Sequence, residues 1–152
     1  QYDPKYDVIG SLIDTFTEPG SDSGQKFQIC WPDMSHLAYT IAAQITLLTR
    51  GLGLLATSVP VQQLVTKFTS MLRFLQLPEQ PKVSCAVLMI QWPSLVVGIN
   101  CVKEEDRFLV MKLFRVLAQI GSGSARYLLR KLHKAWQGGA GDDLDSVDIL
   151  TY

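Results

Sequence analysis

The chain contains few of the residues that most often carry chemistry: three cysteines and two histidines among 152 residues. Cys30, Cys85 and Cys101 are odd in number, widely spaced and form no CxxC motif, which argues against a disulfide framework. We therefore expect buried, reduced thiols rather than one disulfide with a spare cysteine. His36 and His133 lie far apart, and Cys30 with His36 alone lacks the ligand set of a metal site. The sequence predicts no metal and no other cofactor.

Nucleotide-binding and catalytic patterns are also missing. The sequence contains neither GxxxxGK[ST] nor GxGxxG, the glycine-rich loops that hold nucleotide phosphates. The turn GSGS at 121–124 precedes a predicted helix, but no strand precedes it and no P-loop lysine follows, so we interpret it as a helix break. The acids at 104–106 are adjacent, and adjacent residues on a helix do not face each other. Because polar groups do not cluster, we predict that the chain is not an enzyme.

The length of the chain favours a single domain with a sizeable core. The formal net charge is zero, and 47% of the residues are hydrophobic, so the chain as a whole has no strong attraction to nucleic acid or membrane. The most apolar window, 83–102, contains Gln91, Pro93, Gly98 and Asn100, which are costly in lipid. We interpret this window as two short buried helices rather than a membrane span, and predict no membrane partner.

Apolar residues recur every three to four positions along most of the chain, which predicts amphipathic helices. The first helix, over 33–57, is expected to begin near Pro32 and to weaken at Gly51 and Gly53. Its predicted buried residues are Leu37, Ile41, Ile45, Leu48, Leu52 and Leu55. Further helices are predicted over 61–76, 82–92, 94–102, 103–120 and 125–136. The best strand candidate, 27–30, is too short to carry a sheet.

Helices joined by short proline and glycine turns pack antiparallel to their neighbours. The pairs 33–57 with 61–76 and 82–102 with 104–120 each span about forty residues, the length of a HEAT or armadillo-type helix pair. Over 33–137 the chain resembles two such pairs followed by a closing helix. The resemblance implies an all-α stack of antiparallel helix pairs, and a closed helical bundle is the alternative.

Two segments flank this helical domain, 33–137. Residues 1–32 are predicted to form an N-terminal extension, in which the apolar spacing of 6–16 is compatible with a short docking helix. Residues 138–152 are predicted to form a flexible acidic C-terminal tail on a glycine-rich tether. Its acids are Asp142, Asp143, Asp145 and Asp148.

The most distinctive stretch is 107–137, which contains half of the basic residues of the chain and no acid. Its cations are Arg107, Lys112, Arg115, Arg126, Arg130, Lys131 and Lys134. Arg126, Arg130 and Lys134 are four residues apart and therefore form one stripe on the last helix. The cations of the preceding helix should lie beside this stripe, giving a basic ridge. The ridge is a solvated face, a docking surface for an acidic partner, or a phosphate-binding surface.

The tail aspartates follow the ridge closely, so the tail is expected to fold back onto the ridge or to bind a partner itself. We predict a non-catalytic protein–protein interaction or scaffold domain, excised from a larger intracellular protein of the cytoplasm or nucleus. Its partner is another protein or a subunit of a larger complex, nucleic acid at the ridge, or a second copy. One alternative is a nucleic-acid-binding helical domain regulated by its tail. The other is a secreted, cytokine-like four-helix bundle, which predicts a disulfide.

Overall fold

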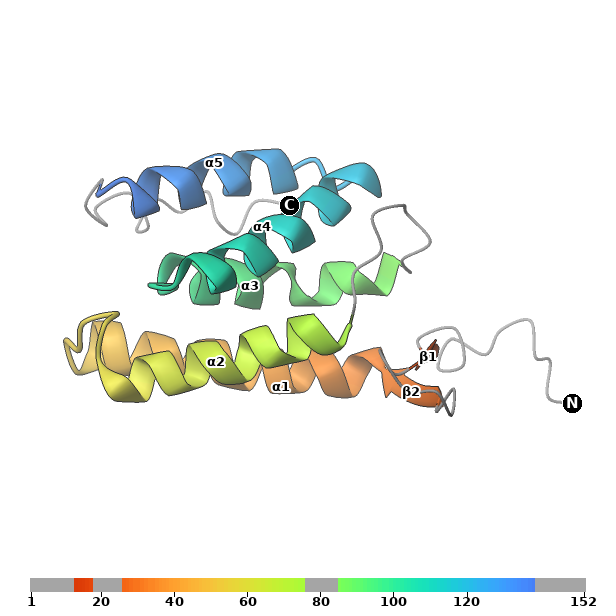
Figure 1. Ribbon diagram of the computed structural model, residues 1–152, viewed down its shortest axis with the longest axis horizontal. Coiled ribbons are helices and arrows are strands. Elements are labelled where there is room, and N and C mark those ends of the chain that lie inside the picture. Colours follow the sequence, from red (N-terminus) through yellow and green to blue (C-terminus); the bar gives the residue numbers. More distant parts are fainter. Residues whose placement is uncertain (1–12, 18–25, 76–84, 139–152) are drawn as a thin grey trace, which may run out of the picture.

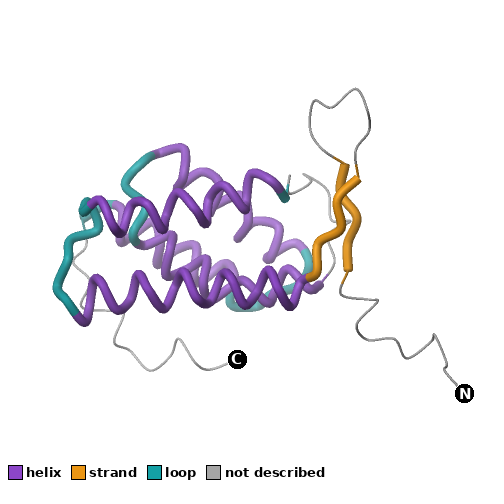
Figure 2. Tube along the Cα trace, turned by 90° about the horizontal axis from the view of Figure 1, so that it is seen from below, coloured by secondary structure: helices purple, strands orange, loops and turns teal. Residues whose placement is uncertain are grey.

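The computed structural model describes residues 13–17, 26–75 and 85–138. These residues form a body of layered helices with a small β-hairpin at one end (Figures 1 and 2), and the predicted all-α class is confirmed. The hairpin strands are β1 (Ile13–Thr17) and β2 (Lys26–Cys30). The helices are α1 (Trp31–Thr46), the π-helical turn η3 (Leu47–Gly51), α2 (Val59–Phe74), the 3₁₀ turn η4 (Cys85–Ile90), α3 (Gln91–Ile99), α4 (Glu104–Gln119) and α5 (Ala125–Trp136).

The first helix is shorter than the predicted span 33–57. Regular α-helix ends at Thr46 and passes into η3, and Gly53 then adopts a φ of +68°, which favours glycine. The helical turns therefore end at Gly51, where the sequence predicted that the helix would weaken. The predicted burial of Leu52 and Leu55 is wrong, because both follow the end of the helix and are exposed. Leu37 is also exposed, because it lies beside the buried stripe of α1 rather than on it.

The helices bury one continuous core. Helix α1 packs against α2, η4 and α3, α4 packs against α2 and α3, and α5 packs against α3 and α4. Figure 1 shows these layers, with α1 and α2 on one side of the body, α5 on the other, and α3 and α4 between them. The largest fully buried side chains include Trp31, Phe68 and Phe114. The periodic apolar positions of the sequence therefore supply the core of a layered helical domain.

The apolar window 83–102 contains two short elements, as predicted, of which the first is the 3₁₀ turn η4 and the second is α3. The predicted break between 92 and 94 is wrong, because α3 begins at Gln91 and includes Pro93. Pro93 is buried in the first turn of α3, where its missing N–H costs no helical hydrogen bond. A Cβ atom at Gly98 would lie only 2.8 Å from Leu132 Cδ2 and 2.9 Å from Val110 Cγ1, so glycine permits the close approach of α3 to its neighbours. Among the described residues, no helix has the length and apolar character needed to cross a membrane.

The hairpin is a feature that the helical periodicity did not predict. Strands β1 and β2 pair antiparallel, with Ile13 opposite Cys30 and Phe16 opposite Phe27. The segment 27–30 does form a strand, because 13–17 supplies its hydrogen-bonding partner. The suggested docking helix over 6–16 is wrong at 13–16, which lie in β1, whereas 6–12 lie outside the described residues. The hairpin lies at the edge of the helical body (Figure 2), so the fold class is unchanged.

Candidate functional site

Helix α5 places three cations of the predicted ridge on one outward stripe. Its inner face buries Ala125, Leu128 and Leu132. Arg126, Arg130 and Lys134 are all exposed, as their four-residue spacing requires once the leucines face the core. Helix α5 packs against α3 and α4, and this exposed stripe lies on its outward side.

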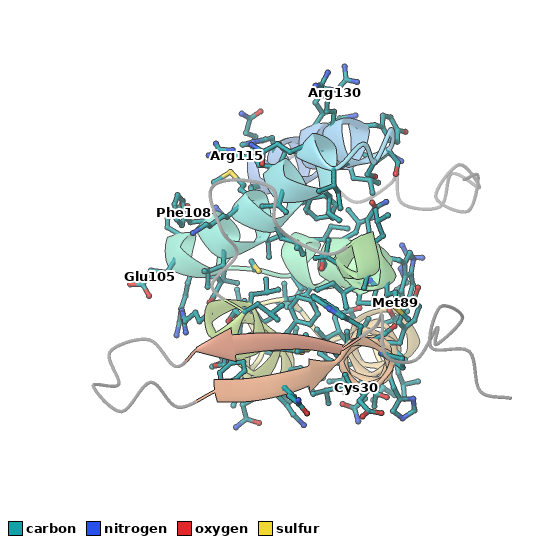
Figure 3. All side chains as sticks on the ribbon, turned by 90° about the vertical axis from the view of Figure 1, so that its right-hand side faces the viewer. Cys30, Met89, Glu105, Phe108, Arg115 and Arg130 are labelled. Carbon is teal, nitrogen blue, oxygen red and sulfur yellow. The ribbon has the colours of Figure 1, made fainter. Side chains whose placement is uncertain are left out.

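Helix α4 adds two more cations beside α5. Arg115 is exposed and Lys112 is partly exposed, and α4 packs directly against α5. Figure 3 shows Arg115 projecting outward from α4 and Arg130 projecting outward from α5. Within the part of the chain that the structure describes, neither arginine forms an ion pair or a hydrogen bond through its side chain. The charges of both are therefore available to an anionic ligand.

Lys131 lies at the side of this surface and is partly engaged within α5. Its Nζ atom is 4.9 Å from the centre of the Tyr127 ring, a cation–π geometry. Tyr127 itself is exposed. Lys131 extends the cationic surface along α5. Its ammonium group covers one face of the tyrosine ring.

Arg107 has a structural position that separates it from the other cations of the ridge. Its Nε donates a hydrogen bond of 3.0 Å to the carbonyl oxygen of Cys101, and Nη1 donates one of 2.9 Å to Glu104 Oε1. Its guanidinium carbon also lies 5.4 Å from the ring centre of Trp136. Arg107 therefore joins the start of α4 to the end of α5. The remaining six cations form what we call the basic surface: Lys112, Arg115, Arg126, Arg130, Lys131 and Lys134.

Trp136 packs toward the body rather than offering a free ring. Its Nε1 donates a hydrogen bond of 2.8 Å to the carbonyl oxygen of Gly98, and the His133 ring meets it edge-on at 5.6 Å between ring centres. The ring of Trp136 is therefore engaged in contacts with the body. The tail aspartates Asp142, Asp143, Asp145 and Asp148 lie outside the described residues, and their contact with the ridge stays a prediction.

The acids at the start of α4 include one buried residue that was not expected from the sequence. Glu104, Glu105 and Asp106 occupy the first turn, where negative charge complements the helix dipole. Asp106, however, is only 3% exposed, and its Oδ1 lies 3.4 Å from Nη2 of Arg73 on α2. The three-to-four periodicity could have predicted the burial of Asp106, since this residue lies four positions before the buried Val110.

A groove between α2 and α4 lies next to this ion pair. It has a volume of about 500 Å³ and is lined by Arg73, Glu104, Glu105, Phe108, Leu109 and Met111. Figure 3 shows Glu105 and Phe108 projecting from the same side of α4 as Arg115. The groove combines an apolar floor with charges of both signs, which distinguishes it from the basic surface.

The cysteines behave as thiols where the structure describes them. Cys30 is partly buried and Cys101 is buried, and neither is in a disulfide; the side chain of Cys85 lies outside the described residues. Burial raises the pKa of Cys101 to about 12, Asp106 adds to the rise, and Arg107 opposes it. Cys101 is therefore a neutral, unreactive thiol at physiological pH. No group of three or more His, Cys, Asp or Glu among the described residues is arranged to hold a metal ion.

These features define a helical domain whose most distinctive site is a charged surface rather than a cavity with converging reactive groups. The chain belongs to the family described as the fungal specific transcription factor domain, whose sequence model matches residues 9–146. It is 27% identical over 131 residues to the lysine biosynthesis regulatory protein LYS14 of Saccharomyces cerevisiae. That match covers 86% of this chain and 16% of LYS14, so the chain spans a small part of this relative. No solved structure matches significantly.

The family assignment corrects two predictions. The HEAT or armadillo resemblance is wrong, since the chain belongs to a transcription factor family; a forty-residue spacing of helix pairs is not specific to repeat proteins. The predicted scaffold domain is wrong for the same reason, as is the secreted cytokine-like alternative, because the family is one of transcription factors and the relative is named as a regulatory protein. The family is one of transcription factors rather than enzymes, and it fits interaction with nucleic acid and the nuclear alternative for its location.

Proposed function

We propose that this chain is a regulatory domain of a nuclear transcription regulator, and that its basic surface contacts the phosphate backbone of nucleic acid. The observation that carries the proposal is the outward stripe of Arg126, Arg130 and Lys134 with Arg115 beside it, in a stretch without acids, 107–137. Membership of a transcription factor family supports nucleic acid as the polyanion that such a surface would bind.

The chemistry of the cations suits phosphate. Guanidinium groups donate paired hydrogen bonds to phosphate oxygens, and arginine is weakly hydrated compared with lysine. Arg115, Arg126 and Arg130 supply three such groups on two adjacent helices. Because the chain has no net charge, attraction would be confined to this surface, and the contact would reinforce a regulator that other parts of the protein bring to DNA.

The same surface provides little for reading base sequence. The ring of Trp136 is held against Gly98 and Arg107, and the exposed Tyr127 ring carries the ammonium group of Lys131. Phosphate contacts position a protein on DNA without selecting a sequence. The expected binding is therefore independent of sequence and strongly dependent on salt.

The test is a titration of fluorescent duplex DNA with the chain over a series of salt concentrations. For the variant Arg126→Glu/Arg130→Glu we expect affinity to fall at least tenfold, and the slope of log K against log salt to shrink by about 0.9 for each phosphate that the variant no longer neutralises. Lys67→Glu, which reverses one exposed charge on α2, is a control outside the basic surface and should change affinity much less. Equal affinity of the parent chain and the double variant would refute the phosphate contact.

The regulatory part of the proposal has its own test. The chain is joined to an unrelated DNA-binding domain, and transcription of a reporter carrying that domain's site is measured. We expect the fusion to change reporter transcription relative to the DNA-binding domain alone. An unchanged reporter, with the fusion folded and bound at its site, would contradict a regulatory role for this part of the chain.

A further inference from the structure

One end of the helical body exposes large apolar side chains that the core does not use. Leu52 is 67% exposed, Leu55 is 73% exposed and Val59 is 68% exposed. All three belong to the turn between η3 and α2 or to the first residue of α2. We call this turn, with Leu47 and Val102, the apolar end; its members are Leu47, Leu52, Leu55, Val59 and Val102. Clustered apolar exposure of this kind marks an interaction site more often than a solvated surface.

The apolar end is one structural unit, because a glutamine joins its two turns. Gln62 Nε2 donates hydrogen bonds to the carbonyl oxygens of Ala56, at 2.6 Å, and Asn100, at 2.8 Å. The turn before α2 and the turn between α3 and α4 therefore meet at the same end of the body, as Figure 1 shows. Val102 lies in this second turn and is also exposed.

Helix α5 ends at this same end of the molecule. Trp136 Nε1 is bonded to the carbonyl oxygen of Gly98, two residues before the Asn100 carbonyl that Gln62 holds. Gly138 then has a φ of +85°, a left-handed conformation that terminates a helix. The end of α5 and the apolar end therefore lie at the same end of the helical body (Figure 1). Since an extended chain covers at most about 3.6 Å per residue, the residues from 138 to 144 can span about 20 Å.

The segment that begins there matches the apolar end in both apolar character and charge. Residues 142–150 read DDLDSVDIL, which alternates acids with Leu144, Val147, Ile149 and Leu150. The segment 138–152 contains no lysine or arginine. By contrast, residues 34–78, which include most of the apolar end, contain no acid. At the second turn, Val102 is followed by the exposed Lys103 and then by the exposed Glu104 and Glu105, so the favourable charge lies on the side of residues 34–78.

We infer that the apolar end is the docking site for residues 142–150 of this same chain. In this docking, the leucine, valine and isoleucine side chains of the segment contact the exposed leucines, and its aspartates lie toward the neighbouring cations. The short glycine-rich tether gives the segment an effective concentration in the millimolar range, so even a weak contact would be populated. Docking would remove apolar surface of the body and of the segment from water together. This docking does not depend on the proposed phosphate contact.

Hydrogen exchange read by mass spectrometry tests the docking in the whole chain. Peptides covering 47–59 should exchange more slowly in the full chain than in a chain ending at Gly138, and Leu144→Asp/Ile149→Asp should exchange like the shortened chain. Unchanged exchange of 47–59 on removing the segment would overturn the inference. So would protection that persists in the shortened chain and rises with protein concentration, because a second copy would then cover the apolar end.

A labelled peptide of residues 139–152, added to the chain ending at Gly138, identifies the surface that it occupies. We expect saturable binding, weakened at least fivefold by Leu52→Asp/Leu55→Asp and little changed by Leu88→Asp, an exposed leucine on η4. Binding that is abolished by Arg126→Glu/Arg130→Glu and kept with Leu52→Asp/Leu55→Asp would place the segment on the basic surface and refute docking at the apolar end.

Discussion

The indole Nε1 of Trp136 donates a hydrogen bond of 2.8 Å to the carbonyl oxygen of Gly98, which attaches the last helix, α5, to the central helix α3. Gly98 contributes to the same junction through its lack of a side chain, since Leu132 of α5 and Val110 of α4 occupy the space where a Cβ would lie. The position of the basic surface therefore depends on a contact between two residues without charge.

Replacing Gly98 with alanine should loosen this junction. The new Cβ would approach Leu132 Cδ2 to 2.8 Å and Val110 Cγ1 to 2.9 Å, and such overpacking typically costs about 1–3 kcal/mol. Chemical denaturation should show the destabilisation as a lower midpoint. Gly123→Ala is the matched control, because nothing lies within 4 Å of a Cβ at Gly123. Equal stability of Gly98→Ala and the parent chain would contradict the close packing.

Replacing Trp136 with phenylalanine removes the hydrogen bond to Gly98 and part of the indole ring, and keeps an aromatic side chain at this position. The phenylalanine cannot donate to Gly98 and offers a weaker face to Arg107, so we expect a decrease of about 1 kcal/mol in the free energy of unfolding. Tyr127→Phe removes a polar group from an exposed aromatic side chain on the same helix and should change stability less. Denaturation in urea measures both, and a larger effect for Tyr127→Phe would contradict this account of α5.

The ion pair between Arg73 and Asp106 should contribute more to the free energy of unfolding than the ion pair between Arg73 and Glu105. Asp106 is buried, whereas the side chain of Glu105 is 86% exposed and lies 3.8 Å from the same Arg73 nitrogen. Asp106→Ala removes the partner of the arginine and should cost about 1–3 kcal/mol, while Glu105→Gln should cost less than about 0.5 kcal/mol because exposed pairs contribute little. Thermal melts of the two variants decide the order, and an equal effect would show that burial of Asp106 is unimportant.

Periodicity was sufficient to predict the helical class because most core positions follow a spacing of three to four residues. The final helix illustrates this, since Leu128 and Leu132 are buried and Arg126 and Arg130 are exposed as their spacing requires. The prediction failed where a local break changed which residues reach the core. Leu52 continued the apparent stripe of α1, but the helix ends before it.

Contacts between distant residues account for the rest of the candidate site. Arg107 has the same chemistry as the other ridge cations, and only the packing of Cys101 and Trp136 around its guanidinium reveals its internal role. The hairpin also depends on a contact between separate segments, because 26–30 forms a strand by pairing with 13–17. Helix spacing could not identify the family, because many unrelated helical proteins share that spacing.

Cys101 should react far more slowly with alkylating reagents than Cys30 in the folded chain. Its pKa is raised to about 12, first by burial and then by Asp106, so the reactive thiolate is scarce at pH 8, and the buried sulfur is also shielded from reagent. Timed iodoacetamide labelling followed by peptide mass spectrometry should show Cys30 modified first, with Cys101 modified only after denaturation. Equal labelling rates in the folded chain would contradict the burial of Cys101.

The raised pKa also predicts how Cys101 affects stability with pH. The folded pKa of about 12 lies above the ordinary value of 9.0 for a free cysteine, so the unfolded chain releases the thiol proton at lower pH than the folded chain does. The stabilising contribution is complete below pH 9 and disappears as pH rises from about 9 toward 12. Cys101→Ala removes this contribution, so the stability of the parent relative to the variant should decline across that range. Urea denaturation at about pH 8 and about pH 10.5, on either side of the unfolded pKa, measures the difference. If the stability of the parent chain relative to the variant increased at the higher pH, the thiol would ionise more readily in the folded state than in the unfolded state.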